Sequence, residues 1–263
     1  MESNGRYTLM ELMVCAAAHL LEDGKTAVIG TGAPLAAAML AQKTHAPHLI
    51  VMFEAGSMAP VLEKLPISVA GSHTQTRAIL HGSMDDIMEA CQRGMVDYSF
   101  LGGAQIDRYG NLNSTFIGSD YRHPQVRLPG SGGANDLASL CWRTVAIVPH
   151  SKRKFVEKVD FVTSPGYLSG PGAREAAGLP PDSGPWKVIS TLALMGFDEE
   201  SKCMRVESLF PGVTRAEVEA ATGFELLFAD PLGITSEPTD AELRILREEV
   251  DPLGRITGKI MKD

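Results

Sequence analysis

Short apolar runs alternate with a helical pattern in the first part of the chain. The runs at 26–30 and 49–53 are bounded by glycine or turn residues, which is typical of buried strands. Between them, Pro34 begins an apolar stretch that continues to Ala41, and proline is favoured at a first helical position. Strand–helix–strand alternation predicts parallel strands joined by crossover helices. We therefore expect an α/β fold, an open and mostly parallel sheet with helices on both faces.

Two segments interrupt this alternation. Residues 102–133 and 164–185 are rich in Gly, Asn, Pro and Ser and have little periodicity, so both are predicted to be long loops of the functional kind. No internal repeat or low-complexity linker divides the chain, and residues 1–263 are interpreted as a single domain. Further helices are expected at 8–21, 83–94, 137–141, 214–221 and 239–249, and further strands at 97–101, 144–148, 187–190 and 203–207.

Composition narrows the classes of function. The 263 residues are 44% hydrophobic and 21% charged, as in ordinary globular proteins, and the formal net charge is -8. An acidic chain lacks the positive potential that attracts the phosphates of nucleic acids, which argues against nucleic-acid binding. The only compact basic cluster is Lys152-Arg153-Lys154. It is interpreted as a solvated loop after a strand, with contact to an anionic cofactor as the alternative.

Neither a metal site nor a membrane segment is expected. The four cysteines are scattered without a CxxC pair, and the histidines form no ligand pattern, so no metal is predicted. The apolar stretch Met10–Leu21 is interrupted by Glu11 and His19, which favours an amphipathic helix over a secretory signal. No apolar run is long enough to span a membrane, and the cytoplasm is the expected compartment.

Glu54 ends the apolar run at 49–53 and is followed at once by Ala55 and Gly56. The carboxyl ends of strands in open α/β sheets usually border the ligand crevice. A carboxylate at the end of a buried strand also loses hydration, which is costly without compensation. Glu54 is therefore either a hydrogen-bonding anchor for the next turn or a reactive group.

Two glycine-rich turns follow predicted strands. Gly30-Thr31-Gly32 suggests a dinucleotide fingerprint, but the third glycine would fall at Leu35, so a tight strand-to-helix turn that could present N–H groups to an anion is favoured. After the strand at 97–101, Gly102 and Gly103 allow close approach of a ligand, and Gln105 adds a side-chain donor. The next residues, 107–111, are interpreted as a hairpin turn without a catalytic role.

A third glycine-rich segment is the strongest candidate for an anion site. Ser131, Gly132, Gly133 and Asn135 lead into an expected helix, so several backbone N–H groups point in one direction. Such an arrangement suits a phosphate or an oxyanion. There is no G-x-S-x-G elbow, and a serine-hydrolase interpretation has no support.

Taken in order, these segments resemble the family I coenzyme A transferases, and specifically their β subunits. The resemblance covers most of the chain. The segments that carry it are Val28–Leu35, the strand ending in Glu54, Gly102–Asp107 with Asn113–Thr115, Ser131–Asn135, Thr163–Gly166, Gly170–Gly172 and Arg247–Pro252. An ordered match of this length is far more specific than any one motif.

The resemblance implies roles for individual residues. Glu54 matches the catalytic glutamate, which attacks an acyl-CoA thioester and carries an acyl and then a CoA group. Gly133, with Gly132 before it, matches the glycine pair that donates backbone N–H groups to the oxyanion. Gln105 lies in the loop that lines the same pocket. The other residues expected to contact substrate or CoA are Gly32, Gly103, Ser131 and Asn135. One departure is that Phe53 and Ala55 replace polar neighbours of the glutamate.

The resemblance also implies partners and a substrate class. Acyl-CoA and a short carboxylic acid, such as the dicarboxylate glutaconate, would be the substrates, without a metal. A homologous α subunit would complete the active site at a shared interface. Alternatives on the same fold are a CoA-thioester hydrolase, a lyase, or a non-catalytic ligand-binding subunit in which Glu54 only caps the Gly56-Ser57 turn. A phosphate-binding sugar isomerase or sensor domain is a further alternative.

Overall fold

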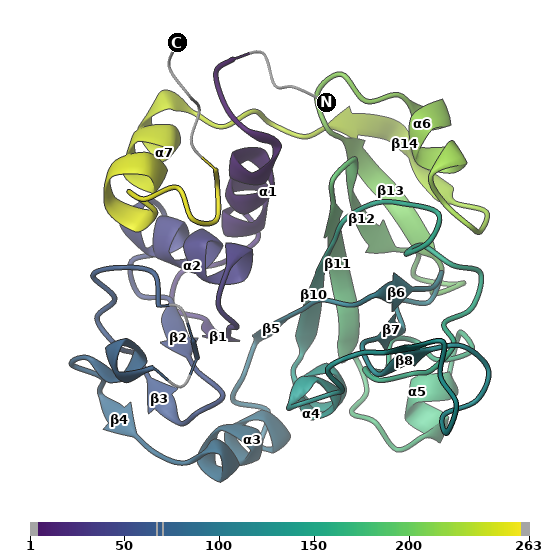
Figure 1. Cartoon of the computed structure of the whole chain (residues 1–263), viewed down its shortest axis with the longest axis horizontal. Coiled ribbons are helices and arrows are strands. Elements are labelled where there is room, and N and C mark those ends of the chain that lie inside the picture. The colour runs from purple at the N-terminus through teal and green to yellow at the C-terminus, as the bar shows by residue number, and fades with distance from the viewer. Residues whose placement is uncertain (1–4, 67, 70, 259–263) are drawn as a thin grey trace. The chain divides into compact units, whose positions relative to one another are not determined.

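The computed structural model describes residues 5–66, 68–69 and 71–258. These residues group into two compact units (Figure 1). The first unit contains the described residues up to Tyr98 together with those from Ser236 onwards. The second unit is the intervening segment Ser99–Thr235. That residues 1–263 form a single domain stays a prediction.

The first unit is built on short strands with a parallel pair at their centre. Strands β1 (Thr26–Val28) and β2 (Ile50–Met52) are parallel, with Ala27 opposite Val51. Two-residue strands β3 (Ser57–Met58) and β4 (Leu80–His81) extend this sheet by antiparallel pairing. The buried positions of β1 and β2 confirm the strands predicted from their apolar runs.

Side-chain capping boxes begin three of the helices of the first unit, those that start at Leu9, Met84 and Asp240. The Thr8 side chain accepts from the Glu11 N–H, and the Glu11 carboxylate accepts from the Thr8 N–H, so a capping box starts α1. Ser83 and Asp86 form the same motif at the start of α3, which lies within the helix expected at 83–94. The helices are α1 (Leu9–Ala18), α2 (Ala33–Lys43), α3 (Met84–Gln92) and α7 (Asp240–Ile245), followed by a π-helical turn at Leu246–Val250.

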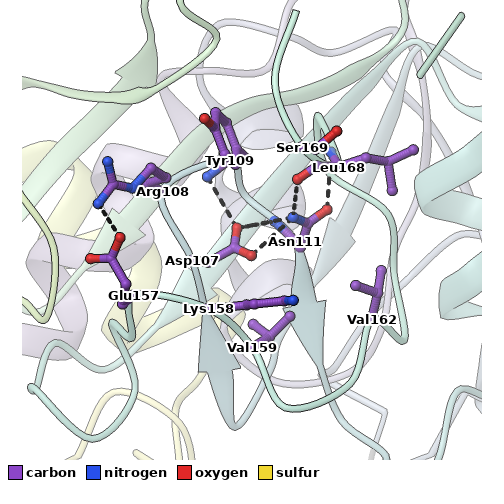
Figure 2. Close-up of a pocket in the computed structure, with 10 residues that line it drawn as sticks. All are labelled: Asp107, Arg108, Tyr109, Asn111, Glu157, Lys158, Val159, Val162, Leu168 and Ser169. Carbon is purple, nitrogen blue, oxygen red and sulfur yellow. Dashed lines mark hydrogen bonds and ion pairs between the residues drawn. The ribbon is translucent and has the colours of Figure 1, made fainter. Parts of the chain in front are cut away.

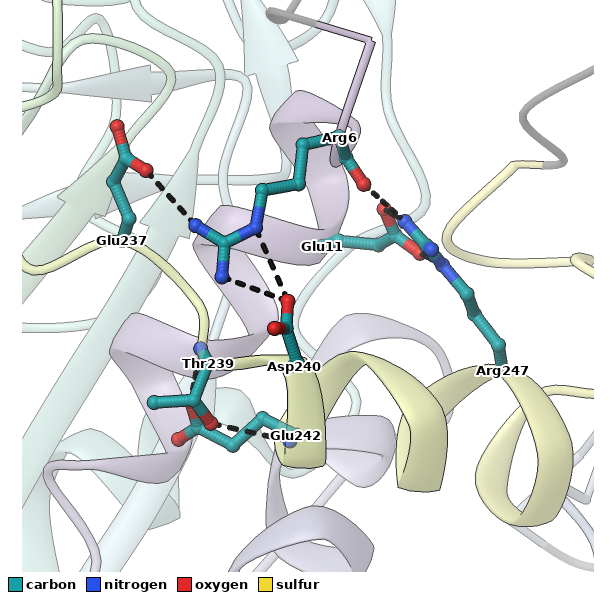
Figure 3. Close-up of polar contacts among 7 residues, drawn as sticks. All are labelled: Arg6, Glu11, Glu237, Thr239, Asp240, Glu242 and Arg247. Atoms are coloured by element: carbon teal, nitrogen blue, oxygen red, sulfur yellow. Dashed lines mark hydrogen bonds and ion pairs between the residues drawn. The ribbon is translucent and has the colours of Figure 1, made fainter.

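A buried carboxylate joins α1 to the C-terminal helical segment (Figure 3). Glu11 is only 1% exposed, and both of its oxygens accept from Arg247, at 2.6 and 2.9 Å. Arg6 pairs with Asp240 at 2.9 Å and with Glu237 at 3.3 Å. Bidentate guanidinium–carboxylate pairing compensates for the desolvation of Glu11. The first unit therefore includes segments from both ends of the chain.

The second unit contains a larger mixed sheet, in which β10 is parallel to β11 and β13 to β14. Strands β11, β12 and β13 form an antiparallel meander. The strands, in spatial order, are β14 (Leu227–Ile234), β13 (Met204–Leu209), β12 (Ala193–Phe197), β11 (Gly184–Ser190), β10 (Arg143–Val148) and β5 (Tyr98–Leu101), of which only Tyr98 is assigned to the first unit. The α/β class is confirmed, whereas β12 and β14 were not predicted because neither has a simple alternating pattern.

The segment 102–133, predicted to be a loop, contains two short hairpins. They are β6 (Gln105–Ile106) with β7 (Leu112–Asn113), and β8 (Phe116–Ile117) with β9 (Val126–Arg127). Three short helices complete the unit: α4 (Ala134–Leu140), α5 (Ala173–Ala176) and α6 (Arg215–Ala220). The two hairpins are stabilised by buried polar side chains such as Asn113. A strand of two residues is too short to show the alternation of apolar and polar positions from which strands are predicted. Among the described residues, no helix is both long and apolar enough to cross a membrane.

Candidate active site

Glu54 lies in the tight turn that connects β2 to β3. The Gly56 N–H donates to the Phe53 carbonyl at 2.9 Å, and the Phe53 N–H donates to the Ser57 carbonyl at 2.8 Å. These two bonds close a hairpin turn, so the backbone of Glu54 is held by its neighbours on both sides. The Glu54 side chain is half-buried, while Phe53 before it is fully buried. A carboxylate is thus held on a turn that follows directly from the sheet.

Glycine is required at position 56. Its φ is +109°, and a Cβ there would lie 2.0 Å from the Gly82 carbonyl oxygen. The Gly82 N–H also donates to the Gly56 carbonyl at 2.8 Å, so the two backbones are in direct contact. Ser57 is buried and donates its hydroxyl to the Thr74 carbonyl. Contacts with Gly82 and Thr74 therefore hold the Glu54 turn in place, mainly through backbone groups.

The apolar neighbours of Glu54 belong to the core. Phe53 is 0% exposed and Met52 is 3% exposed, so these side chains pack inside the first unit. Ala55 is half-buried in the turn itself. The apolar residues at positions 53 and 55, where the resemblance implies polar ones, therefore reflect local packing around β2.

Gly32 lies at the entrance of α2. It has φ +92° and ψ -145°, and its carbonyl accepts the Ala36 N–H at 3.1 Å, which begins the helix. A Cβ at Gly32 would meet no atom within 4 Å, so glycine is favoured by backbone conformation and not by space. The predicted strand-to-helix turn is confirmed. Contact between Gly32 and substrate stays a prediction.

In the second unit, Gln105 and Gly103 lie in a hairpin that is bonded internally. Gln105 is 6% exposed, and its side-chain oxygen accepts from the Asn113 amide at 2.8 Å and from the Asp160 N–H at 3.0 Å. The Ala104 N–H donates to the Asn113 carbonyl at 2.8 Å. A Cβ at Gly103 would lie 3.0 Å from the Gln105 carbonyl oxygen. Both residues therefore shape the β6–β7 hairpin, and their role in substrate binding stays a prediction.

The glycine-rich segment before α4 forms a compact turn. Gly132 has φ +50°, the Ala134 N–H donates to the Ser131 carbonyl at 2.9 Å, and the Gly133 carbonyl accepts the Leu137 N–H at 2.9 Å. The helix thus begins three residues earlier than the predicted Leu137. Asn135 is exposed in the first turn and donates from Nδ2 to the Thr163 carbonyl at 3.0 Å. The role of this turn as an anion site stays a prediction.

A buried arginine that the sequence interpretation missed lies beneath this helix. Arg174 is 2% exposed, and burial lowers its pKa. Its Nη1 donates to the carbonyls of Pro165 and Gly166, both at 3.0 Å. Its Nη2 donates to the Ala138 carbonyl at 3.2 Å and to a serine hydroxyl at 3.0 Å. The guanidinium therefore joins the C-terminal half of α4 to the strap at residues 163–166. An Arg two positions after Gly170-Pro171-Gly172 was the available signal.

The α4 helix is consequently attached to the strap at both ends. Near the beginning of α4, Asn135 donates to the Thr163 carbonyl. Near the end of α4, Arg174 donates to main-chain carbonyls of the helix. A positive charge at the C-terminal end of a helix also favours the helix dipole. Side-chain hydrogen bonds thus set the position of the glycine turn that precedes α4.

Comparison with known proteins decides the family. A family model described as Coenzyme A transferase matches residues 10–221, well over half of the chain. The chain belongs to the coenzyme A transferase family. The resemblance inferred from the ordered motifs is confirmed.

This coenzyme A transferase chain is similar, over most of its length, to subunits of two named enzymes. It is 36% identical over 255 residues to a subunit of glutaconate CoA-transferase from Acidaminococcus fermentans, covering 94% of this chain and 93% of that protein. It is 38% identical over 242 residues to a subunit of 3-oxoadipate CoA-transferase from Pseudomonas knackmussii, covering 92% of each. The crystal structure of the A. fermentans enzyme has a TM-score of 0.92 at 34% identity, covering 98% of this chain and 100% of that one.

Relatives named for other reactions share the fold. The cholesterol ring-cleaving hydrolase IpdB subunit of Mycobacterium tuberculosis is 30% identical over 258 residues, covering 93% of this chain and 95% of that protein. The structure of the decarboxylase AibA/AibB has a TM-score of 0.82 at 25% identity, covering 96% of this chain and 100% of that one. The reaction must therefore be argued from the residues of the site.

The coenzyme A transferase chain also has a pocket of about 620 Å³ in its second unit (Figure 2). Asp107 is 4% exposed in its wall and accepts from the Asn111 side chain at 2.9 and 3.1 Å and from the Tyr109 N–H at 3.0 Å. Burial raises the pKa of Asp107. The Gly110 N–H donates to the Asp107 carbonyl at 3.0 Å, which confirms the predicted turn at 107–111. These polar groups bond to one another, so they stabilise the hairpin.

Proposed function

We propose that this chain is the β subunit of an acyl-CoA:carboxylate CoA-transferase, with Glu54 as its nucleophile. The observation that carries the proposal is a carboxylate on a rigid hairpin turn at the end of a buried strand, in a chain of the coenzyme A transferase family. A fixed backbone limits the motion of the attacking group, which favours an aligned attack. The alternative role of Glu54 as a cap for the turn is less favoured, because backbone bonds already close that turn.

The reaction proceeds by covalent catalysis in balanced steps. A Glu54 carboxylate oxygen attacks the carbonyl carbon of the acyl-CoA, and the C–S bond breaks to give an acyl-glutamyl anhydride and CoA thiolate. The thiolate then attacks the side-chain carbonyl carbon of Glu54. This step releases the donor acid as a carboxylate and leaves a glutamyl-CoA thioester. The acceptor acid reverses the sequence, and the kinetics are expected to be ping-pong.

Each attack places negative charge on a carbonyl oxygen. Gly132 and Gly133 are proposed to donate backbone N–H groups to it, supported by their turn before α4. Loss of one such donor typically costs about 3 kcal/mol in the barrier. The buried side chains of Met52 and Phe53 support exclusion of water on the strand side of Glu54, which protects the anhydride from hydrolysis.

The partner and the substrate class are inferred from the relatives. Both transferase relatives carry the name of one subunit of their enzyme and resemble this chain over more than nine-tenths of its length. This supports assembly with a homologous α subunit and an active site shared with it. Glutaconate and 3-oxoadipate, the acids in those names, are both short dicarboxylates. A short dicarboxylic acid is accordingly the proposed acceptor, with glutaconate as the first candidate.

Trapping the covalent intermediate tests the proposal. The purified α/β complex is mixed with glutaconyl-CoA, treated with borohydride or hydroxylamine, and digested for peptide mapping by mass spectrometry. Modification is expected at Glu54, since a thioester or anhydride there reacts with either reagent. An active complex that leaves Glu54 unmodified would refute the assignment. The matched control is Glu54→Gln, which should show no adduct.

Hydrolysis is the second candidate, favoured by the relative named as a ring-cleaving hydrolase. The two reactions differ in what happens without an acceptor acid. A transferase should release at most one donor acid per active site and no continuing CoA, because CoA stays on Glu54 as a thioester until an acceptor acid arrives. Continuous CoA release without acceptor would identify a hydrolase.

A further inference from the structure

A cationic turn follows the carboxyl end of β10. We define it as residues 151–154, which include Lys152, Arg153 and Lys154. The Lys154 and Phe155 N–H groups both donate to the Ser151 carbonyl at 2.9 Å, so the turn is hydrogen-bonded. Lys152 and Arg153 are exposed and Lys154 is half-buried. Three neighbouring cations are thereby displayed on a defined piece of backbone.

The cationic turn is anchored on both sides by buried groups. Phe155 is 0% exposed, and its ring stacks on His150 at a centroid distance of 3.8 Å. The Ile106 N–H donates to the Lys154 carbonyl at 2.7 Å, and the Val156 N–H donates to the Ile106 carbonyl at 2.9 Å. Ordering this segment on binding would therefore cost little entropy, because folding has already ordered it.

No acidic side chain neutralises the cationic turn within the part of the chain that the structure describes. Neither an ion pair nor a side-chain hydrogen bond is made there by Lys152, Arg153 or Lys154. The nearest acid in the sequence, Glu157, is already paired with Arg108. The protein has a formal net charge of -8, so the positive potential at the cationic turn is opposite in sign to the net charge of the chain.

The position of the cationic turn also fits a ligand site. It follows the carboxyl end of β10, and β10 is parallel to β11. The carboxyl ends of parallel strands border the ligand crevice in open α/β sheets. Gly102, at the end of β5, approaches the same end of β10, since a Cβ on it would lie 3.6 Å from the Ile147 carbonyl oxygen. The turn thus shares an edge of the sheet with the predicted Gly102-Gly103 loop.

We propose that the cationic turn binds the phosphate groups of the nucleotide end of coenzyme A. This inference rests on the proposed function for its choice of ligand. Coenzyme A carries a diphosphate and a 3′-phosphate, and clustered Lys and Arg side chains are the usual partners for such groups. The turn then contributes to binding of the CoA moiety without touching the reacting thioester.

The test compares two thioesters that differ only in the nucleotide. Wild type and K152Q/R153Q/K154Q are assembled with the α subunit and assayed with an acyl-CoA and with the same acyl group on pantetheine, which lacks the nucleotide. The variant should raise KM for the acyl-CoA by about tenfold or more, because hydrogen bonds to charged groups are among the strongest. Its KM for the acyl-pantetheine should stay unchanged. Equal effects on both substrates, or no effect on either, would overturn the proposal.

A binding measurement separates this proposal from the proposed reaction. Titration calorimetry with adenosine 3′,5′-bisphosphate needs no turnover, so it reports on the cationic turn even if Glu54 is not a nucleophile. Wild-type complex should bind this probe with an affinity that falls with salt, and the triple variant should lose binding. An assembled variant complex that binds the probe as wild type does would contradict the assignment.

A matched variant controls for total charge. K64Q/R93Q/R255Q also removes three positive charges, all from exposed residues of the first unit. It should leave both KM values and the binding of the probe unchanged. A loss of CoA affinity equal to that of the cationic-turn variant would show a general charge effect and refute a local site.

Discussion

The turn that carries Glu54 and the turn before α4 are held in place by different means. The backbone holds the Glu54 turn, through bonds between Phe53, Gly56 and Ser57 and through direct contact with Gly82. The turn before α4 depends on side chains, since Asn135 and the buried Arg174 attach the helix to the strap. A backbone-held turn tolerates few substitutions at its glycine but many around it. A side-chain-held turn can be loosened by a single truncation elsewhere.

The largest effect is expected from changing the Glu54 side chain itself. Glu54→Gln removes the nucleophile and should lower kcat by about 10⁴-fold or more, as for other covalent catalysts. Glu54→Asp keeps the charge but withdraws it by one methylene, which should lower kcat by about 100-fold. Steady-state transfer assays of the α/β complex measure both. Because the backbone holds this turn, both variants should melt within a few degrees of wild type. Near-normal transfer by either variant would contradict the nucleophile assignment.

The next effect tests the side-chain-held turn. Arg174→Met should lower the free energy of unfolding by about 3 kcal/mol, because buried carbonyls of α4 and the strap lose their donor. If α4 carries the oxyanion donors, the same variant should also lower kcat under conditions where the protein is still folded. Urea denaturation measures the unfolding free energy. The control is Arg93→Met, which removes only an exposed i,i+4 pair with Glu89 and should change stability by about 0.5 kcal/mol or less.

A substitution of Gly56 in the backbone-held turn is expected to lower the free energy of unfolding by a smaller amount. Gly56→Ala should cost about 2 kcal/mol or more, since its φ is positive and its Cβ would overlap the Gly82 carbonyl. Gly24→Ala is the matched control, because Gly24 has φ +72° with no atom within 4 Å of the added Cβ. The difference between the two unfolding free energies isolates the close approach. Equal losses would show that backbone conformation alone accounts for both.

The smallest effect concerns His150, which anchors the cationic turn through Phe155. Its nitrogens lie 2.8 Å from the Ser190 hydroxyl and 3.0 Å from the Thr222 hydroxyl, and burial lowers its pKa from 6.5 to about 4. As the pH falls, His150 is therefore protonated at a higher pH in the unfolded chain than in the folded protein. Stability is fully present above about pH 6.5 and declines as the pH falls toward 4, by about 1–2 kcal/mol at pH 5. Denaturation of His150→Gln between pH 5 and 7 should lack this part of the decline. An identical slope in both proteins would refute it.

The sequence interpretation succeeded where apolar runs are long. The strands β1, β2, β5 and β10 and the helices α1, α2 and α3 were all predicted, because burial of one face imposes a period that can be counted. It failed at the two-residue strands β6–β9, whose positions depend on buried polar side chains such as Asn113. For the site, the glycine-rich segment was correctly predicted to lead into a helix, although α4 begins at Ala134 and not at Leu137. Arg174 was missed because its partners are main-chain carbonyls that no sequence motif displays.

By itself, the sequence determined the family and the α/β class and led to the proposal of Glu54 as nucleophile, since ordered motifs and apolar periodicity are properties of neighbouring residues. Only the tertiary structure decided how each turn is held. The contact of Gly56 with Gly82 joins segments that are 26 positions apart, and Arg174 reaches the carbonyl of Ala138 across 36 positions. Such contacts depend on how distant segments pack, so local propensity cannot reveal them.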